Sequence, residues 1–172
     1  MKVKNIKRAI FKIDLAKVFD KVSWIYLRLI LTHLGFDIAF IRWILSCITT
    51  ISFSVLINGA ASPFFQVECG LRQGCPLSHL LFLLVAEGLS HALKEEIRLG
   101  NFTGLQLAQN LHISHLLFVD DILIFCSGLV RDLFALDGIL KIFSKVTGMD
   151  INIGKSTAIP YLLSREEERV LS

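Results

Sequence analysis

Residues 112–128, HISHLLFVDDILIFCSG, decide the fold of this chain. Two adjacent carboxylates, Asp120 and Asp121, interrupt an apolar run that continues for four residues on each side. Two apolar strand-like runs around two residues predict a β-hairpin with Asp120 and Asp121 at its tip. Ionised carboxylates are rarely buried without a partner, and no Lys or Arg lies between Arg98 and Arg131. The question is therefore what holds two negative charges at this place.

An Asp-Asp pair is an unfavourable choice for a two-residue hairpin tip. Tight hairpins favour Asn-Gly or Asp-Gly, because the turn needs positive φ. Two adjacent carboxylates also repel each other, by on the order of several kcal/mol in a poorly hydrated site. A divalent cation removes that repulsion, and Mg²⁺ typically takes one or two carboxylates together with phosphate oxygens. The alternative interpretation is an exposed polar turn, and this segment alone does not decide between the two.

A third carboxylate lies in the segment FKIDLAKVFDKVSW, residues 11–24. Asp14 ends a short apolar strand and can project from the end of a sheet, whereas Asp20 precedes a helix and is expected to cap it. Carboxylates on two neighbouring strands can hold two metal ions about 4 Å apart, the arrangement used for in-line phosphoryl transfer. We therefore predict that Asp14 and Asp120 lie on adjacent strands, with carboxylates close enough to share a metal ion.

The rest of the chain mixes helices with short strands. Helical periodicity predicts helices over about 24–34, 38–48, 76–99 and 133–147, and strand-like segments include a hairpin (51–59 and 64–69, around a short polar turn) and DINI at 150–153. These elements do not alternate as βαβ units, so we predict an α+β fold, an antiparallel sheet with helices packed on one face. Without repeats or linkers, residues 1–172 are expected to form one domain.

The composition is apolar, with 53% hydrophobic and only 19% charged residues. This indicates either a membrane protein or part of a larger assembly that covers some of the apolar surface. The longest uncharged stretch, 43–67, is interrupted by Asn58, Gly59 and Pro63, so it does not suit a spanning helix of roughly 20 apolar residues. We expect no stable membrane association. The spacing of the four cysteines matches neither a zinc site nor a disulfide framework, which predicts reduced, mostly buried thiols in an intracellular protein. Whether that protein belongs in the nucleus or in an organelle is left undetermined by the sequence.

Four segments, in this order, resemble the motifs of reverse transcriptases, and most closely those of LINE-type, non-LTR retrotransposon polymerases. They are KIDLAKVFDKVSW (12–24), GLRQGCPLSHLLF (70–82), HLLFVDDILIF (115–125) and TGMDINIGKS (147–156). The resemblance covers about residues 10–160. It implies a right-hand polymerase whose palm is an antiparallel sheet backed by helices, in agreement with the layout above. It also implies an RNA-directed DNA polymerase that transfers a nucleotide from a dNTP to a primer 3′-OH on an RNA template.

The resemblance also implies roles for individual residues. Asp14, Asp120 and Asp121 match the metal site, which would hold two Mg²⁺ ions or Mn²⁺ in their place, and Asp120 would ligate more directly than Asp121. Lys155 matches a lysine that protonates the pyrophosphate leaving group or stabilises its charge. Phe19 matches a steric gate against a ribose 2′-OH, with a core aromatic as the alternative interpretation.

The segment RQG resembles the part of the family that supports the incoming nucleotide and the template. Gly70 and Gly74 would allow close backbone approach, Gln73 would supply an amide and Arg72 would meet a phosphate. A plain loop before a helix is the alternative interpretation of these residues.

The length of the chain predicts an incomplete polymerase. Only 13 residues precede Asp14 and 17 follow Lys155, which leaves no room for the family's fingers upstream or thumb downstream. We therefore expect a palm fragment that is inactive alone, because phosphoryl transfer needs positioning and cationic groups that this chain would lack. Two alternatives remain open: a non-catalytic retrotransposon remnant, and a small membrane-associated protein whose aspartates occupy turns.

Overall fold

The computed structural model describes residues 8–108, 111–118, 121–127 and 129–161. These residues belong to two compact units, which we call unit 1 (1–16, 86–145 and 149–172) and unit 2 (17–85 and 146–148). The expectation of a single domain over residues 1–172 stays a prediction. The elements, in chain order, are β1 (Arg8–Ala16), α1 (Val18–Lys21), α2 (Trp24–His33), α3 (Ile38–Thr49), β2 (Ser52–Phe53), β3 (Leu56–Ile57), β4 (Ala60–Ala61), β5 (Phe65–Gln66), α4 (Pro76–Arg98), β6 (Leu105–Ala108), β7 (Leu111–Ile113), β8 (His115–Phe118), β9 (Asp121–Cys126), α5 (Val130–Thr147), β10 (Asp150–Ile151) and β11 (Thr157–Tyr161).

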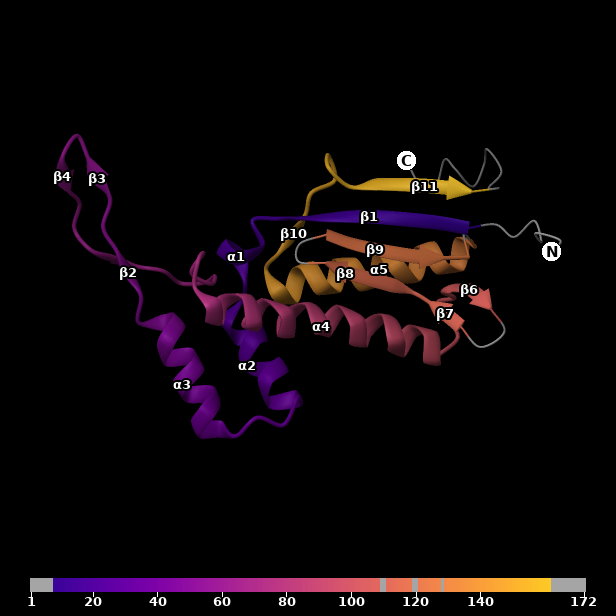
Figure 1. Ribbon diagram of the computed structural model, residues 1–172, viewed down its shortest axis with the longest axis horizontal. Helices are drawn as coiled ribbons and strands as arrows, with labels where there is room; N and C mark the ends of the chain where they lie inside the picture. Colours follow the sequence, from indigo (N-terminus) through magenta and orange to yellow (C-terminus); the bar gives the residue numbers. More distant parts are fainter. Residues whose placement is uncertain (1–7, 109–110, 119–120, 128, 162–172) are drawn as a thin grey trace. The chain divides into compact units, whose positions relative to one another are not determined.

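Unit 1 is built on an antiparallel sheet with β1 at its centre. β9 pairs with one edge of β1 and is followed outward by β8, while β10 and β11 both pair with the other edge (Figure 1). All of these pairings are antiparallel. The structure thus confirms the predicted α+β fold with an antiparallel sheet.

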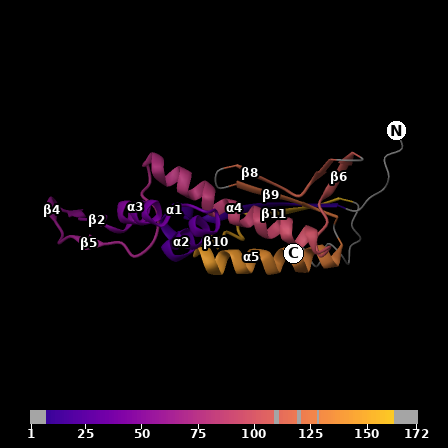
Figure 2. The ribbon, with the colours of Figure 1, turned by 90° about the horizontal axis from the view of Figure 1, so that it is seen from below.

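The two faces of this sheet differ. Alternate residues of β1 and β9, Ala9, Ile13 and Leu15 with Ile122, Ile124 and Cys126, are buried. A cavity of about 330 Å³ is lined by Phe11 and Ile13 together with Leu133, Leu136 and Leu140 of α5, so α5 packs on this side of the strands (Figure 2). The intervening residues of β1 and β9 point to the opposite, open face, because side chains alternate along a strand.

Helix α4 confirms the helix predicted over residues 76–99. Within the described residues it is the one helix whose length and composition suit a membrane span, and 44% of its most apolar window is buried in the structure. Its buried residues recur at helical spacing: Leu81, Phe82, Val85, Ala86, Leu89 and Leu93. This is the pattern of a helix whose apolar stripe contributes to a protein core.

The hairpin of unit 2 turns earlier than predicted. Leu56 and Ile57 pair with Ala61 and Ala60, so the turn lies at residues 58–59 rather than at 60–63. Asn58 and Gly59 both have positive φ, 50° and 86°, as a tight two-residue hairpin requires. The Asn-Gly pair is the sequence feature that could have located this turn.

Several further predictions need correction. Asp20 does not cap a helix: it lies inside α1, and the Ser23 side chain caps α2 by accepting a hydrogen bond from Tyr26 N. The predicted strand 150–153 ends at Ile151, because the following residues leave the ladder. β6, β7 and β11 were not predicted. The cysteines are free as expected but not mostly buried, since Cys126 is buried while Cys47 and Cys69 are exposed and Cys75 is intermediate.

Candidate active site

The strand register brings two of the predicted carboxylates together. Asp14 of β1 lies directly opposite Asp121, the first residue of β9. Side chains of directly opposed residues in an antiparallel pair project from the same face, with Cβ atoms about 5 Å apart. Their strand neighbours Ile13 and Ile122 are buried, so Asp14 and Asp121 lie on the open face. Both have intermediate exposure.

A lysine supplies the positive charge that the hairpin segment lacks. Lys12 Nζ lies 3.1 Å from Asp121 Oδ1, and the side chains are 47% and 45% exposed. Lys12 precedes Asp14 by two residues on the same strand, so both side chains project from the open face. The partner of the Asp121 charge therefore comes from a strand more than 100 residues earlier in the sequence.

The tip of the β8–β9 hairpin differs by one residue from the prediction. Phe118 pairs with Asp121, so Asp121 belongs to the strand rather than to the tip. Asp120 lies outside the described residues. The prediction that Asp14 and Asp120 share a metal ion therefore stays a prediction, while the structure places the neighbouring Asp121 beside Asp14.

Lys155 lies in the segment 152–156 between β10 and β11, which is hydrogen-bonded to the backbone of Asp14. Residues 152–156 leave the edge of the sheet between β10 and β11. Asp14 N donates to Ser156 Oγ at 3.1 Å, and Asn152 N donates to the carbonyl oxygen of Asp14 at 2.8 Å. Ser156 Oγ donates in turn to Asn152 O. These bonds tie the exposed Lys155 segment to the strand position that carries the Asp14 carboxylate.

The donor chemistry of the open face suits a hard cation. Carboxylate oxygens are the ligands that Mg²⁺ prefers. In this structure the ammonium group of Lys12 is the cation beside the Asp121 carboxylate. Within the part of the chain that the structure describes, no three His, Cys, Asp or Glu side chains form a group able to hold a metal ion. A third carboxylate would have to come from Asp120.

In unit 2, the segment that begins GLRQ is fastened to residues 19–24. Gly70 N donates to Val22 O at 2.8 Å, and the Trp24 indole Nε1 donates to Gly70 O at 2.7 Å. Leu71 N donates to Phe19 O at 2.5 Å. Gly70 has a φ of 91°, and a Cβ on it would lie 2.6 Å from Asp20 O. Gly70 thus allows a close approach to the backbone of Asp20, while its expected approach to a nucleotide or template stays a prediction.

The predicted substrate-binding residues of this segment have separate surroundings. Gln73 Nε2 donates to Asp20 Oδ1 at 2.9 Å, so the amide engages a carboxylate within unit 2. Gly74 has a φ of 77° and nothing within 4 Å of the position of an added Cβ, and its expected close approach to the nucleotide stays a prediction. Arg72 is exposed. The Phe19 ring packs on Phe82 at 5.2 Å between centroids and retains intermediate exposure.

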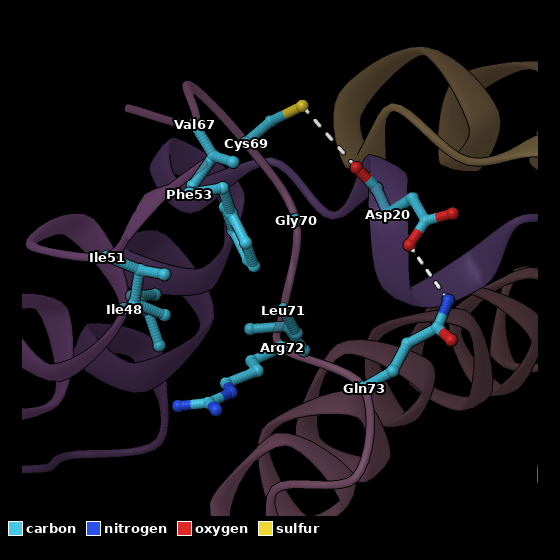
Figure 3. A pocket seen from close by; sticks show the side chains of 10 residues that line it. All are labelled: Asp20, Ile48, Ile51, Phe53, Val67, Cys69, Gly70, Leu71, Arg72 and Gln73. Atoms are coloured by element: carbon cyan, nitrogen blue, oxygen red, sulfur yellow. Dashed lines mark hydrogen bonds between the residues drawn. The ribbon is translucent and has the colours of Figure 1, made fainter. Parts of the chain in front are cut away.

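A pocket of about 460 Å³ opens beside this segment (Figure 3). Asp20 lies on one side of Gly70, and the apolar wall lies on the other, with the Arg72 side chain extending toward that wall. The pocket is lined by Asp20, Ile48, Ile51, Phe53, Val67, Cys69, Gly70, Leu71, Arg72 and Gln73. Sequence reasoning missed this pocket, because Ile48, Ile51 and Phe53 come from residues with no motif of their own.

His115 has a structural setting, as the sequence interpretation expected. Its Nε2 lies 3.0 Å from Ser90 Oγ, and its Nδ1 lies 2.8 Å from Ser114 Oγ. Burial lowers the pKa of His115, and the charge of Lys94 adds to that shift, while Glu87 opposes it. The histidine thus links β8 to α4 in its neutral form.

Comparison with known proteins now decides the family. Residues 1–165 match the family model described as reverse transcriptase (RNA-dependent DNA polymerase). The chain belongs to this family. Its relatives include a Pol polyprotein from the type-1 retrotransposable element R2 of Popillia japonica, 28% identical over 67% of this chain, and a 149 kDa protein of the transposon TX1 of Xenopus laevis, 26% identical over 90% of it. Both relatives confirm the predicted LINE-type, non-LTR reverse transcriptase domain.

An uncharacterized mitochondrial protein of Arabidopsis thaliana is 42% identical over 38% of this chain. The chain spans about half the length of this protein (55%), 18% of the R2 polyprotein and 12% of the TX1 protein.

Solved telomerase structures show the same fold as this reverse transcriptase domain. Apo telomerase from Candida tropicalis, truncated from its C-terminal domain, has a TM-score of 0.69 at 16% identity, and the match covers 93% of this chain and 32% of that one. Telomerase from Candida albicans, in complex with a fragment of telomeric RNA, has a TM-score of 0.68 at 14% identity, covering 92% and 28%. The predicted polymerase fold is confirmed. Reverse transcriptases generally use divalent metal ions, which fits the carboxylates of the open face.

Proposed function

We propose that this chain is the palm core of an RNA-directed DNA polymerase, which transfers a nucleotide from a dNTP to the 3′-OH of a primer on an RNA template. The observation that carries the proposal is the direct opposition of Asp14 and Asp121 on the open face of two paired strands. Two carboxylates at this distance repel each other unless a cation lies between or beside them. A family whose chemistry uses divalent ions accounts for that placement.

In this proposal Asp14, Asp120 and Asp121 hold two Mg²⁺ ions, and Mn²⁺ can replace them. When bound, these ions activate the primer 3′-OH and stabilise the charge that develops on the phosphate. Asp14 contributes from the rigid centre of the sheet, between β9 and the β10–β11 edge. Lys155, in the segment hydrogen-bonded to Asp14, supplies a positive charge or a proton for the departing pyrophosphate.

The remaining assigned residues belong to substrate binding. Arg72 supplies a positive charge for a phosphate or template backbone, and Gln73 and Gly74 shape the segment that supports the nucleotide. Phe19 excludes a ribose 2′-OH. Its ring centroid lies 5.2 Å from that of Phe82 and 5.3 Å from that of His79, and the residue retains intermediate exposure, which supports this role because a gate must be held in place and still be accessible.

We further propose that the 172-residue chain does not polymerise DNA by itself. Its curated relatives are longer, and phosphoryl transfer depends on groups that position the triphosphate and clamp the primer–template. A net charge of +3 gives little electrostatic attraction for a duplex at physiological salt. A primer-extension assay on an RNA template with Mg²⁺ or Mn²⁺ should give no product. Extension that disappears in the Asp120→Ala, Asp121→Ala variant would contradict this part of the proposal.

The catalytic assignment itself needs a complete polymerase. We would replace the matching region of an R2-type polymerase by residues 1–165 of this chain and measure primer extension on an RNA template. The expected result is extension that Asp14→Asn reduces at least about 1,000-fold, since the carboxylate acts in the transition state. The matched control, Asp137→Asn on the exposed surface of α5, should retain activity. A folded chimera without activity would favour the non-catalytic remnant.

A further inference from the structure

Lys12 lies beside the carboxylates of the open face, although the motifs gave it no role. It stands opposite Leu123 on β9 and Thr157 on β11, so it belongs to the central strand with a neighbour on each side. Its ammonium reaches diagonally to Asp121 at 3.1 Å. Asp14, the residue directly opposite Asp121, follows two positions later on the same face.

This pair differs from an ordinary surface ion pair. On α5, Lys141 Nζ lies 2.7 Å from Asp137 Oδ2, with side chains 74% and 56% exposed and four positions apart on one helix. Such exposed pairs contribute little. Lys12 instead pairs with a carboxylate that faces a second carboxylate across the ladder, where a cation removes repulsion between two groups of like charge.

We propose that Lys12 is a positioning residue for the metal site, and this inference rests on the function proposed above. In the absence of nucleotide its ammonium pairs with the Asp121 carboxylate and so competes with a metal ion for this ligand. Its positive charge also weakens the attraction of the open face for a free divalent ion. The triphosphate of a dNTP brings negative charge that offsets Lys12, so metal binding becomes coupled to nucleotide binding.

The test is Mn²⁺ binding to the 172-residue chain, measured by electron paramagnetic resonance of the free ion. Lys12→Met keeps the length of the side chain and removes its charge, and it should bind Mn²⁺ about fivefold more tightly than the wild type. Lys12→Arg, which keeps the charge, should stay within about twofold of the wild type. Lys141→Met is the matched control and should not change the affinity. Lys12→Gln is a second neutral variant if Lys12→Met does not fold.

A double-mutant comparison separates positioning from simple charge. Asp121→Asn should weaken Mn²⁺ binding more strongly in the Lys12→Met background than in the wild type, because only the freed carboxylate ligates the ion directly. Equal effects in the two backgrounds would show that the charges merely add, and would overturn the positioning role. Unchanged or weaker binding by both neutral Lys12 variants would also overturn it.

The same titration distinguishes this inference from the proposed function. Asp14→Asn should weaken Mn²⁺ binding at least about tenfold, because it removes a direct ligand. If Asp14→Asn has no effect, the metal site itself is wrong. If Asp14→Asn weakens binding and the neutral Lys12 variants do not change it, the metal site stands and only the role of Lys12 is wrong.

Discussion

The open face of unit 1 and the GLRQ segment of unit 2 place their polar groups by different means. On the open face, Lys12, Asp14 and Asp121 come together through strand register, and their contacts are between side chains. In unit 2, Gly70 and Leu71 are held by backbone groups, and the Trp24 indole adds a further bond. Charge substitutions should therefore alter the chemistry of the first region with little effect on folding, whereas backbone substitutions should unfold the second.

Asp14 of β1 and Asp20 of α1 show the same difference. Asp14 faces a second carboxylate across the ladder, whereas Asp20 accepts a hydrogen bond from the neutral amide of Gln73. A carboxylate paired with a neutral donor is already satisfied, while a carboxylate opposite another one needs a cation. This difference supports the proposal that Asp14 serves the metal site, whereas Asp20 has a hydrogen-bonding role within unit 2, although both belong to one sequence motif.

The largest effect on stability is expected at Gly70. An alanine there would take a left-handed φ of 91° and place its Cβ 2.6 Å from Asp20 O, so we expect Gly70→Ala to lower the free energy of unfolding by about 3 kcal/mol. Gly74→Ala is the matched control. Its φ is 77° but its surroundings are open, so the loss should be about 1 kcal/mol. Urea unfolding measures both.

An equal loss in the two glycine variants would contradict the account of unit 2. It would mean that the close approach to the Asp20 backbone relaxes at no cost, and that the left-handed conformation alone determines the requirement for glycine. The segment would then depend on its side chains rather than on backbone fit.

Phe19 tests the proposed steric gate against a ribose 2′-OH. In the chimeric polymerase, Phe19→Ala should raise the ratio of ribonucleotide to deoxyribonucleotide incorporation roughly tenfold, since it removes the steric block to a 2′-OH. Trp43→Ala, at an exposed aromatic residue of α3, is the control and should leave the ratio unchanged. A constant ratio in Phe19→Ala would return Phe19 to a packing role on Phe82.

A smaller effect, a loss of stability at acid pH, is expected at His115. This residue lies on the face of the unit 1 sheet that is opposite the open face. Burial lowers the pKa of His115 below its ordinary value of 6.5, so the unfolded chain takes up the proton first as the pH falls. This contribution to stability is complete above about pH 6.5 and is lost as the pH falls from there toward the lowered folded value. His115→Gln should lose less stability than the wild type between pH 7 and pH 5.5.

The measurement for His115 is thermal unfolding across that pH range. His112→Gln, at an exposed histidine of β7, should keep the acid loss of the wild type, because His115 is still present. If His115→Gln shows the full wild-type loss, the acid sensitivity of the chain arises elsewhere.

The sequence predicted the elements that rely on local pattern, and it missed what depends on long-range pairing. Apolar periodicity located α2, α3, α4 and α5, and the apolar runs on either side of the Asp pair predicted β8 and β9. The partner of Asp121 could not be predicted, because Lys12 meets it only through the register of β1 against β9. β11 was missed as well, since Pro160 is unfavourable in a strand except at a sheet edge, and β11 pairs only with β1.

The central claim is the proposal that the open face of unit 1 binds a divalent ion at the Asp14 carboxylate. The most direct test is the anomalous scattering of Mn²⁺ in crystals of the chain. We predict a peak about 2 Å from a carboxylate oxygen of Asp14, absent from crystals of Asp14→Asn. A chain that crystallises with no Mn²⁺ at this face, or with a peak that persists unchanged in Asp14→Asn, would contradict the account.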